Sequence, residues 1–297
     1  AMVFLATGGA KGIAPLCLAA IARARPGCQF YLLGRSPAPP SCSTAEPEWA
    51  RGLPAKDLRR AAFAYLKAAQ PEKPSLQDVR ERVDNVTSVR EICGSLAAIR
   101  EAGGKATYHC CDVVSEESLR TFLETVDVRS ITGIVHAAGV LRDTFISKKK
   151  MSDFDVVYDT KVAGLCNMLS ALQGGCHLKE VVLFSSLAGV HGNAGQADYA
   201  MANEFLSKMA YFLRDQNIDA TACCFGPWDG GMVTPALRRH FDTMGVQIIR
   251  EDQGAQTVAD LAGVGEAQVL VGGWNRPLPS NNRELPPVSA RLPHFVS

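Results

Sequence analysis

The chain has 297 residues, of which 47% are hydrophobic and 21% are charged, and its formal net charge is +1. These values are typical of one large globular α/β domain, and they give no indication of a nucleic-acid partner or of attraction to an anionic membrane. The sequence has no recognisable secretory signal and no apolar run of 18 residues, so we expect a cytoplasmic protein that does not span a membrane.

The ten cysteines lack the CxxC spacing that is typical of metal sites, so we expect no metal. Two adjacent pairs, Cys110-Cys111 and Cys223-Cys224, lie in apolar runs. Free cysteines in such runs behave as small hydrophobic side chains, and disulfides are rare where the compartment is reducing. We therefore interpret both pairs as buried thiols in a reducing compartment.

A buried strand is predicted at Val3–Ala6, and the turn Thr-Gly-Gly-Ala-Lys-Gly-Ile-Ala at positions 7–14 and a helical run through Ile21 follow it. A strand, a glycine turn and a helix in this order are the context in which such a turn binds a dinucleotide. Gly8 permits the tight turn, and Gly12 lets the backbone approach a phosphate at the helix N-terminus. The alternative is a turn without a ligand.

The second predicted strand, Phe30–Leu33, leads into Gly34-Arg35-Ser36. Proteins that prefer NAD place an acidic residue here to bind the ribose 2′-hydroxyl, whereas this chain has Arg35. A guanidinium binds a 2′-phosphate through forked, charge-assisted hydrogen bonds. The sequence therefore predicts NADPH as the cofactor, and the alternative is an arginine that is merely exposed after a strand.

Residues 37–90 are interpreted as an insertion, mostly helical, into a minimal dinucleotide-binding fold. A Pro-rich irregular stretch comes first, and Lys56–Ala69 is a predicted short helix. From Ser75 to Glu101 apolar residues recur in steps of three and four, which predicts one or two amphipathic helices, the last part packed on the sheet. A structural brace is the favoured role of the insertion, and a docking site is the alternative.

A third strand is predicted at Ala106–Cys110, and Asp112 follows it. The plain role of this aspartate is to cap the helix that begins near Glu116, but Ser115 would do so better.

A fourth strand at Ile131–Val135 leads into His136-Ala137-Ala138-Gly139. The small residues let a cofactor lie against the backbone. His136 is interpreted as structural rather than catalytic.

The run Lys148-Lys149-Lys150 precedes a helix predicted at Ser152–Leu172, which contains Lys161. Three lysines in a row are most often a solvated turn. The alternative is a landing patch that attracts an acidic carrier protein over a long range.

A buried strand at Val181–Phe184 leads into Ser185-Ser186, a glycine-rich loop and a helical pattern that Tyr199 opens. Asn203 lies on the same face of this helix, one turn later. A serine at a strand end and a tyrosine thirteen residues later on a helix can bring two hydroxyls to one point. If that point faces a nicotinamide, the two hydroxyls can polarise and protonate a carbonyl.

The spacing of Ser186 and Tyr199 resembles that of the short-chain dehydrogenase/reductase superfamily, and the glycine turn is similar to its variant of the fingerprint. Most members have Tyr-x-x-x-Lys, whereas the fourth residue here is Asn203. The ketoreductase domains of polyketide and fatty-acid synthases share this departure and take their lysine from an earlier helix, where Lys161 lies in Asp-Thr-Lys-Val-Ala-Gly. The pattern SSLAGVHGNAGQADYAMAN most resembles polyunsaturated-fatty-acid synthases and related iterative polyketide synthases, over roughly residues 3–273.

This resemblance implies a Rossmann-like, doubly wound parallel α/β sheet with a helical insertion after the second strand. It implies an NADPH-dependent reductase that converts a 3-ketoacyl thioester on an acyl carrier protein to the 3-hydroxyacyl thioester. The partners would be the carrier-tethered substrate and neighbouring domains of a multidomain synthase.

The resemblance also implies the roles of the site residues. Tyr199 would donate the proton to the forming alkoxide, and Ser186 would orient the same oxygen, with Ser185 as the alternative. Lys161 would bind the nicotinamide ribose and lower the pKa of Tyr199, and Asn203 would hold the geometry. The expected cofactor contacts, besides Lys161 and Tyr199, are Thr7, Gly8, Gly9, Lys11, Gly12, Ile13, Arg35, Ser36, Asp112, Val113, Ala137, Ala138, Gly139, Pro227 and Met232.

Asp143 and His191 are expected to orient the substrate. A family subgroup with a Leu-Asp-Asp signature makes the 3R product, and this chain has Leu141-Arg142-Asp143. The opposite subgroup has a tryptophan eight residues before the tyrosine, where this chain has His191. Both features favour the 3R product, and a solvated loop carboxylate is the alternative for Asp143.

Further strands are predicted at Ala220–Phe225 and Val269–Val271. The loop Gly226–Met232 resembles the segment that closes on the nicotinamide in this family, and residues 233–250 would then form a mobile lid over the substrate.

One NADP-binding catalytic domain is expected at residues 1–275, and the Pro-rich residues 276–297 are interpreted as a linker to a neighbouring synthase domain. The start within a strand is also typical of a domain cut from a longer polypeptide.

Other classes of function stay open. Synthases contain reductase-like structural modules without a cofactor, but those lose the glycine turn or the tyrosine, and this chain keeps both. An inert NADP-binding module and a free-standing reductase of small carbonyls are the remaining alternatives.

Overall fold

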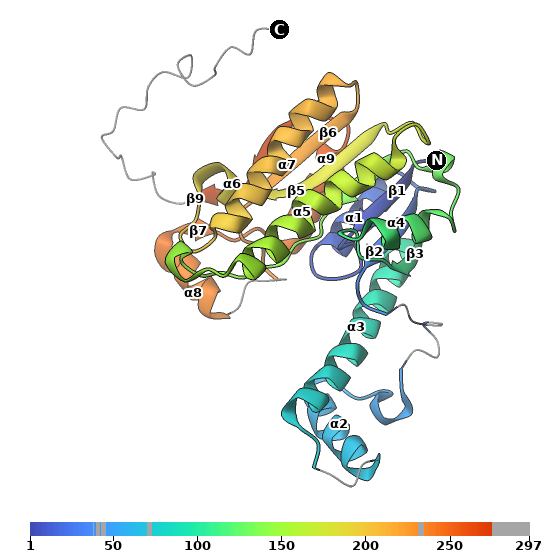
Figure 1. The fold of residues 1–297 in the computed structure, drawn as a ribbon, viewed down its shortest axis with the longest axis vertical. Coiled ribbons are helices and arrows are strands. Elements are labelled where there is room, and N and C mark those ends of the chain that lie inside the picture. Colours follow the sequence, from blue (N-terminus) through green and yellow to red (C-terminus); the bar gives the residue numbers. More distant parts are fainter. Residues whose placement is uncertain (38, 40–41, 43–45, 70–72, 231–234, 275–297) are drawn as a thin grey trace.

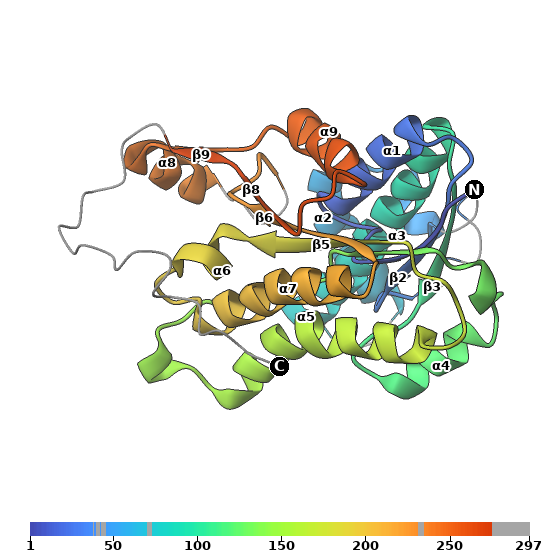
Figure 2. The same cartoon turned by 90° about the horizontal axis from the view of Figure 1, so that it is seen from above.

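A seven-stranded parallel sheet forms the centre of the molecule, with helices on both faces (Figure 1, Figure 2). The computed structural model describes residues 1–274 except 38, 40–41, 43–45, 70–72 and 231–234. The strands are β1 (Val3–Thr7), β2 (Gln29–Gly34), β3 (Lys105–Cys110), β4 (Gly133–His136), β5 (Glu180–Ser186), β6 (Asp219–Phe225) and β8 (Gln268–Val271). Their order is β3-β2-β1-β4-β5-β6-β8, and it confirms the predicted doubly wound fold.

Helices cover the sheet on both sides, and this explains why the central strands β1 and β4 are mostly apolar. On one side lie α1 (Ala14–Ala24), the C-terminal part of α3 (Leu76–Glu101) and α9 (Glu251–Leu261); on the other lie α4 (Glu116–Leu123), α5 (Met151–Leu172) and α7 (Ala197–Asp215) (Figure 2). Phe4 packs in the core with α1, whereas its neighbour Leu5 packs in the core with α5 and α7. Because successive side chains of a strand point to opposite faces, a strand covered on both faces needs a continuous apolar run.

The insertion after β2 is a helical hairpin that projects from the body of the molecule (Figure 1). It consists of α2 (Ala55–Ala69) and the first part of α3, which is one continuous helix of 26 residues. Ser75 and Asp78 form a capping box at the start of α3. The hairpin buries small apolar clusters of its own, with Leu58 in one and Leu66 in another. The predicted helical insertion is therefore confirmed.

Two links hold the segment after β2 against α3. Arg90 of α3 donates hydrogen bonds of 2.8 and 2.9 Å to the two carboxylate oxygens of Glu46. Cys42 and Cys93 form a disulfide, which departs from the expectation of reduced thiols.

The prediction of buried cysteine pairs is confirmed at three of four positions. Cys111, Cys223 and Cys224 are buried. The prediction for Cys110 is wrong: it is exposed, because it ends β3, an edge strand with a neighbour on one side only.

The segment between β6 and β8 contains the predicted lid, of which residues 235–250 are described. It contains α8 (Pro235–Met244) and β7 (Val246–Gln247), and β7 pairs in antiparallel fashion with β9 (Gly273–Trp274). The predicted contact Met232 and the linker at 276–297 lie outside the described residues. In the described part of the chain, no helix is long and apolar enough to cross a membrane. The same residues contain no group of His, Cys, Asp and Glu side chains that can hold a metal ion.

Candidate active site

Many of the predicted site residues lie at the carboxyl ends of the parallel strands. The order of the strands reverses between β1 and β4, and doubly wound sheets bind their ligands at the carboxyl ends of the strands beside such a reversal. The glycine turn follows β1, His136 and the residues Ala137–Gly139 follow β4, and Ser186 ends β5. The fold thus collects residues that are far apart in the sequence.

The three glycines of the first turn occupy their positions for different physical reasons. Gly8 has a φ of +67°, and a Cβ there would lie 2.9 Å from the backbone of Ala137 and Ala138. Gly12 also has a positive φ, of +66°, but a Cβ there would meet no atom within 4 Å. Gly9 faces the core instead, because its Cβ would lie 2.8 Å from the Leu18 side chain. Gly12 alone of these three therefore borders open space.

Polar side chains surround the turn after β2. Lys11 Nζ donates a hydrogen bond of 2.7 Å to Ser36 Oγ, and Arg35 is exposed. Lys11 Nζ also donates to Ser88 Oγ on α3, at 2.6 Å. The sequence alone did not indicate Ser88, because 77 residues separate it from Lys11.

The residues after β3 confirm that Ser115, and not Asp112, caps the next helix. Ser115 caps α4 by accepting a hydrogen bond from the Ser118 amide. Asp112 accepts one from the Val114 amide at 3.1 Å, so it stabilises its own turn and leaves the cap to Ser115. Val113 is buried.

Ser186 and Tyr199 are brought together as their spacing predicts. Ser186 begins the short helix α6 (Leu187–His191) and accepts a hydrogen bond of 3.1 Å from the Ala188 amide. Tyr199 lies half-buried in the first turn of α7. Burial raises the pKa of Tyr199, while hydrogen bonding to Asn203 and Ser186 lowers it. The net direction is upward, so Tyr199 keeps its proton at neutral pH.

Lys161 lies on α5 beneath the tyrosine. Its side chain is 3% exposed, and Nζ donates a hydrogen bond of 2.7 Å to the carbonyl of Phe184. Nζ also lies 5.7 Å from the centre of the Tyr199 ring. Gly139 makes room for it, because a Cβ there would lie 3.2 Å from Lys161 Cε.

Burial lowers the pKa of Lys161 to about 7, because it removes the charged amine from water. The expected lowering of the Tyr199 pKa by Lys161 stays a prediction. Burial dominates at the tyrosine, and the lysine is charged only in part at neutral pH.

Asn203 is fully buried one turn after Tyr199. Its Nδ2 donates a hydrogen bond of 2.7 Å to the Tyr199 carbonyl. Its Oδ1 has no hydrogen-bond partner among the described residues. A buried acceptor without a partner is unfavourable, so this oxygen is available to a ligand or to water.

His136 is buried and links β1 to the backbone of Lys161, which supports the interpretation that it is structural. Its Nε2 lies 2.9 Å from the Lys161 carbonyl and its Nδ1 lies 2.8 Å from Thr7 Oγ1. A carbonyl only accepts, so Nε2 carries the hydrogen and Thr7 donates to Nδ1. Thr7 in turn accepts from the Ala138 amide at 3.2 Å. This chain of bonds requires a neutral imidazole.

A buried ion pair holds the loop after β4 against α7. Lys149 Nζ donates a hydrogen bond of 2.6 Å to Asp198, and the two side chains are 5% and 1% exposed. The other carboxylate oxygen of Asp198 accepts from the Tyr199 amide at 2.9 Å. The interpretation of Lys149 as part of a solvated turn is therefore wrong, although Lys148 and Lys150 are exposed.

The two residues expected to orient the substrate are both exposed. Asp143 accepts a hydrogen bond of 2.8 Å from Gln196 Nε2, just before α7, and its charge raises the pKa of Tyr199. The bond to Gln196 places Asp143 beside the start of the helix that carries Tyr199. His191 ends α6. Pro227 accepts a hydrogen bond from the Ile249 amide at 2.7 Å.

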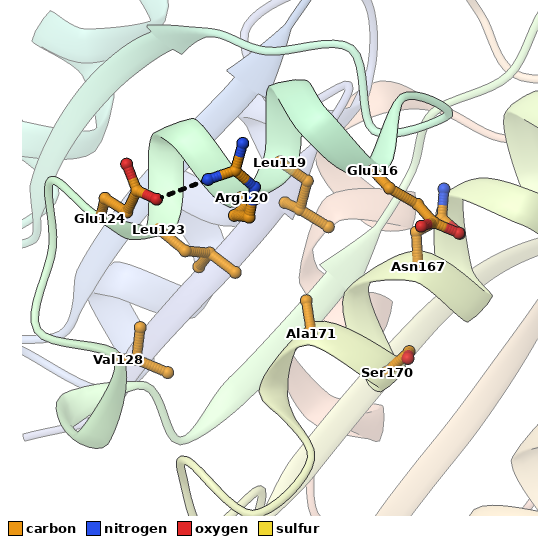
Figure 3. A pocket seen from close by; sticks show the side chains of 9 residues that line it. All are labelled: Glu116, Leu119, Arg120, Leu123, Glu124, Val128, Asn167, Ser170 and Ala171. Atoms are coloured by element: carbon orange, nitrogen blue, oxygen red, sulfur yellow. Dashed lines mark hydrogen bonds and ion pairs between the residues drawn. The ribbon is translucent and has the colours of Figure 1, made fainter.

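A separate groove of about 430 Å³ lies between α4 and α5 (Figure 3). It is lined by Glu116, Leu119, Arg120, Leu123, Glu124, Val128, Asn167, Ser170 and Ala171. None of these is a predicted site residue, and Arg120 is paired with Glu124 at 2.9 Å. The groove is therefore not the candidate active site.

Replacing Lys149 by methionine should lower the free energy of unfolding by about 3 kcal/mol or more, because it leaves Asp198 buried and unpaired. Chemical denaturation measures this change. Lys148→Met is the matched control, and it should change the free energy by less than about 0.5 kcal/mol because Lys148 is exposed. Equal effects of the two variants would contradict the assignment of Lys149.

The stability of the fold should depend on His136 below neutral pH. Burial lowers the pKa of His136 from 6.5 to about 3, so between these values the unfolded chain binds a proton that the folded chain does not. Stability should therefore fall as the pH drops through this window, by at most ~1.4 kcal/mol per pH unit. His136→Asn lacks this titration.

Denaturation of the parent and of His136→Asn between pH 7 and pH 4.5 tests this expectation. The stability advantage of the parent should shrink as the pH falls. An advantage that stays constant over this range would show that His136 does not stay neutral when the chain is folded.

Comparison with known proteins places the site in a family. The chain matches the family model of the KR domain over residues 3–230. It is 45% identical over 284 residues to a polyunsaturated fatty acid synthase polypeptide of Thraustochytrium sp., and the match covers 93% of this chain and 10% of that protein. It is 35% identical over 190 residues to polyketide synthase PksL of Bacillus subtilis, and this match covers 59% of this chain and 4% of that protein.

Solved structures share the fold. A ketoreductase domain from the bacillaene assembly line matches with a TM-score of 0.64 and 26% identity, over 91% of this chain and 55% of that chain. The PlmKR1 ketoreductase from phoslactomycin biosynthesis in Streptomyces sp. HK803 matches with a TM-score of 0.67 and 22% identity, over 94% of this chain and 57% of that chain. The chain thus spans a tenth or less of these curated relatives and just over half of these solved chains. Since the family model covers most of the chain, the chain belongs to the KR domain family, the ketoreductase domains of polyunsaturated-fatty-acid and polyketide synthases.

Proposed function

We propose that this chain uses NADPH to reduce a 3-ketoacyl thioester on an acyl carrier protein to the 3-hydroxyacyl thioester. The observation that carries the proposal is the convergence of Ser186, Tyr199 and Lys161, which come from β5, α7 and α5. The lysine amine lies 5.7 Å from the centre of the tyrosine ring, and hydrogen bonding to Ser186 lowers the pKa of Tyr199. Membership of the KR domain family supports a ketone as the group that this site reduces.

The dinucleotide is proposed to bind at the carboxyl ends of the strands. Gly12 borders open space at the start of α1, where a Cβ would meet no atom within 4 Å. Asn203 offers an unpartnered buried oxygen beside the tyrosine, among the residues described. When bound, the nicotinamide supplies a hydride to the ketone carbon. The other proposed contacts are Thr7, Gly8, Gly9, Ile13, Asp112, Val113, Ala137, Ala138, Gly139, Pro227 and, outside the described residues, Met232.

Tyr199 acts as the general acid in this proposal. A raised pKa keeps its hydroxyl protonated at neutral pH, which is the form that an acid needs. The Ser186 hydroxyl hydrogen-bonds the substrate oxygen and holds it toward Tyr199, so that charge on the forming alkoxide meets a placed donor.

Lys161 responds to the charge that Tyr199 acquires. Its pKa of about 7 leaves the amine near its midpoint at neutral pH. A negative phenolate nearby favours the charged form of the lysine, so uptake of a proton from water at Nζ stabilises the tyrosine anion. The same proton can then be returned to Tyr199. The hydrogen bond from Lys161 Nζ to the Phe184 carbonyl holds the amine in place during this exchange.

The choice of NADPH over NADH is supported by the residues after β2. Arg35 is exposed there and Lys11 is bonded to Ser36, so two positive charges lie where an NAD-binding protein has an acid. Fixed cations favour the phosphate of NADPH over a hydroxyl.

The proposed partners follow from the relatives. The chain spans 10% of the Thraustochytrium synthase polypeptide, so we propose neighbouring synthase domains in cis and a substrate tethered to an acyl carrier protein. Residues 276–297 would be the linker to such a domain, and residues 1–275 the catalytic unit. A cytoplasmic location remains a prediction from the sequence.

The proposed product is the 3R alcohol. Asp143 is bonded to Gln196, just before the helix that carries Tyr199, and acts on the tyrosine electrostatically. A substrate that approaches the tyrosine therefore passes close to this carboxylate, and His191 lies at the end of the neighbouring helix α6. The configuration of the recovered alcohol tests this assignment.

Tyr199→Phe removes the proposed acid and should lower kcat by about 10²–10⁴-fold. The rate of NADPH oxidation with acetoacetyl-CoA measures this effect, and a fluorescence titration should give an NADPH Kd within about threefold of the parent. Tyr211→Phe, which changes an exposed tyrosine on the same helix, is the matched control and should keep the parent rate.

A Tyr199→Phe rate within tenfold of the parent would mean that another group supplies the proton. A parent that binds NADPH but forms no alcohol would support the inert cofactor-binding module instead.

A further inference from the structure

One serine of the insertion helix α3 contacts the glycine turn after β1. Ser88 lies on α3, and its Oγ is 2.6 Å from Lys11 Nζ in the glycine turn. The same lysine nitrogen lies 2.7 Å from Ser36 Oγ after β2. Three segments that are distant in the sequence therefore meet at one amine.

The direction of these hydrogen bonds leaves donors available. A lysine ammonium only donates, so both serine oxygens act as acceptors toward Lys11. Each hydroxyl hydrogen is then free to donate elsewhere, and neither has another acceptor among the described residues. The ammonium has a third hydrogen that these two bonds do not use. The cluster of Lys11, Ser36 and Ser88 thus presents unused hydrogen-bond donors to a ligand.

Positive charge at the cluster is not neutralised within the described residues. Lys11 has no carboxylate partner there, and the exposed Arg35 adjoins Ser36 in the chain. Two cations and two hydroxyls without a carboxylate are the donor set that binds a phosphate monoester.

The helix that carries Ser88 is fixed to the glycine turn at a second point. The buried Ser95, two turns later on α3, donates a hydrogen bond of 2.8 Å to the Ala10 carbonyl. The buried Ile92 of α3 packs in the same core as α1. Ser88 therefore keeps a defined position relative to Lys11, as a ligand requires.

We propose that Ser88 is a ligand of the 2′-phosphate of NADPH, so that the insertion helix takes part in cofactor selection. Ser88 donates its hydroxyl hydrogen to a phosphate oxygen, next to Lys11, Arg35 and Ser36. This inference rests on the proposed NADPH-dependent function. It assigns the insertion a role in binding beside its role as a brace.

Fluorescence titration of the full chain with NADPH and with NADH tests this assignment without turnover. Ser88→Ala should raise the Kd for NADPH by about fivefold to tenfold and leave that for NADH within about twofold. Ser88→Asp should raise the Kd for NADPH by more than about thirtyfold, because a carboxylate then opposes the phosphate and pairs with Lys11. Ser88→Thr keeps a hydroxyl and should keep the parent selectivity.

Thr87→Ala is the matched control. Thr87 is the residue before Ser88 on α3, and its hydroxyl donates to the Val83 carbonyl on the exposed side of the helix. This variant should bind both cofactors as the parent does.

Three results would overturn the inference. The first is an unchanged NADPH Kd in Ser88→Ala and Ser88→Asp, and the second is an equal loss of NADPH and NADH, which would indicate structural damage. The third is a parent that binds both cofactors equally. A parent that selects NADPH through Ser88 but reduces no ketoacyl thioester would leave this inference standing and refute the proposed function alone.

Discussion

The burial of one amine, that of Lys161, sets the geometry of the whole site. The amine is 3% exposed and has a backbone carbonyl, that of Phe184, as its hydrogen-bond partner. Removing a charge from water without a carboxylate partner is costly, and the lowered pKa of Lys161 expresses that cost. Two neighbouring residues position Lys161. Gly139 leaves space for the lysine side chain, and His136 hydrogen-bonds to the lysine carbonyl. A poorly solvated lysine beside Tyr199 is then ready to take up a proton when the tyrosine becomes negative.

Buried polar links also connect the residues at the end of β1 to the catalytic residues. Thr7, at the end of β1, bonds to His136, which bonds to the backbone of Lys161. On the other side, the ion pair of Lys149 and Asp198 fixes the loop after β4 to the first turn of α7. Both links are buried, and each joins different elements of the fold. Rigid positioning of this kind allows proton transfer groups to meet a substrate in one geometry.

Local patterns predicted the fold and the central residues, whereas contacts distant in sequence did not follow from them. The strand, glycine turn and helix at the start, and the spacing of Ser186 and Tyr199, are read within short windows. Lys149 looked like a solvated lysine because its neighbours Lys148 and Lys150 are, and its partner Asp198 lies 49 residues away. The cluster of Lys11 and Ser88 and the disulfide of Cys42 and Cys93 depend in the same way on how α3 packs. The upward pKa of Tyr199 could not be predicted either, since it is set by burial.

The proposed mechanism requires that Tyr199, Ser186 and Lys161 hold a 3-ketoacyl carbonyl where its carbon receives the hydride of NADPH. The most direct measurement is mass spectrometry of the thioester product formed by the purified chain from NADPH deuterated at both C4 positions and a 3-ketoacyl thioester. The mechanism predicts a 3-hydroxyacyl thioester with one deuterium at C3. Oxidation of NADPH with no deuterium in the thioester, or no 3-hydroxyacyl product at all, would contradict it.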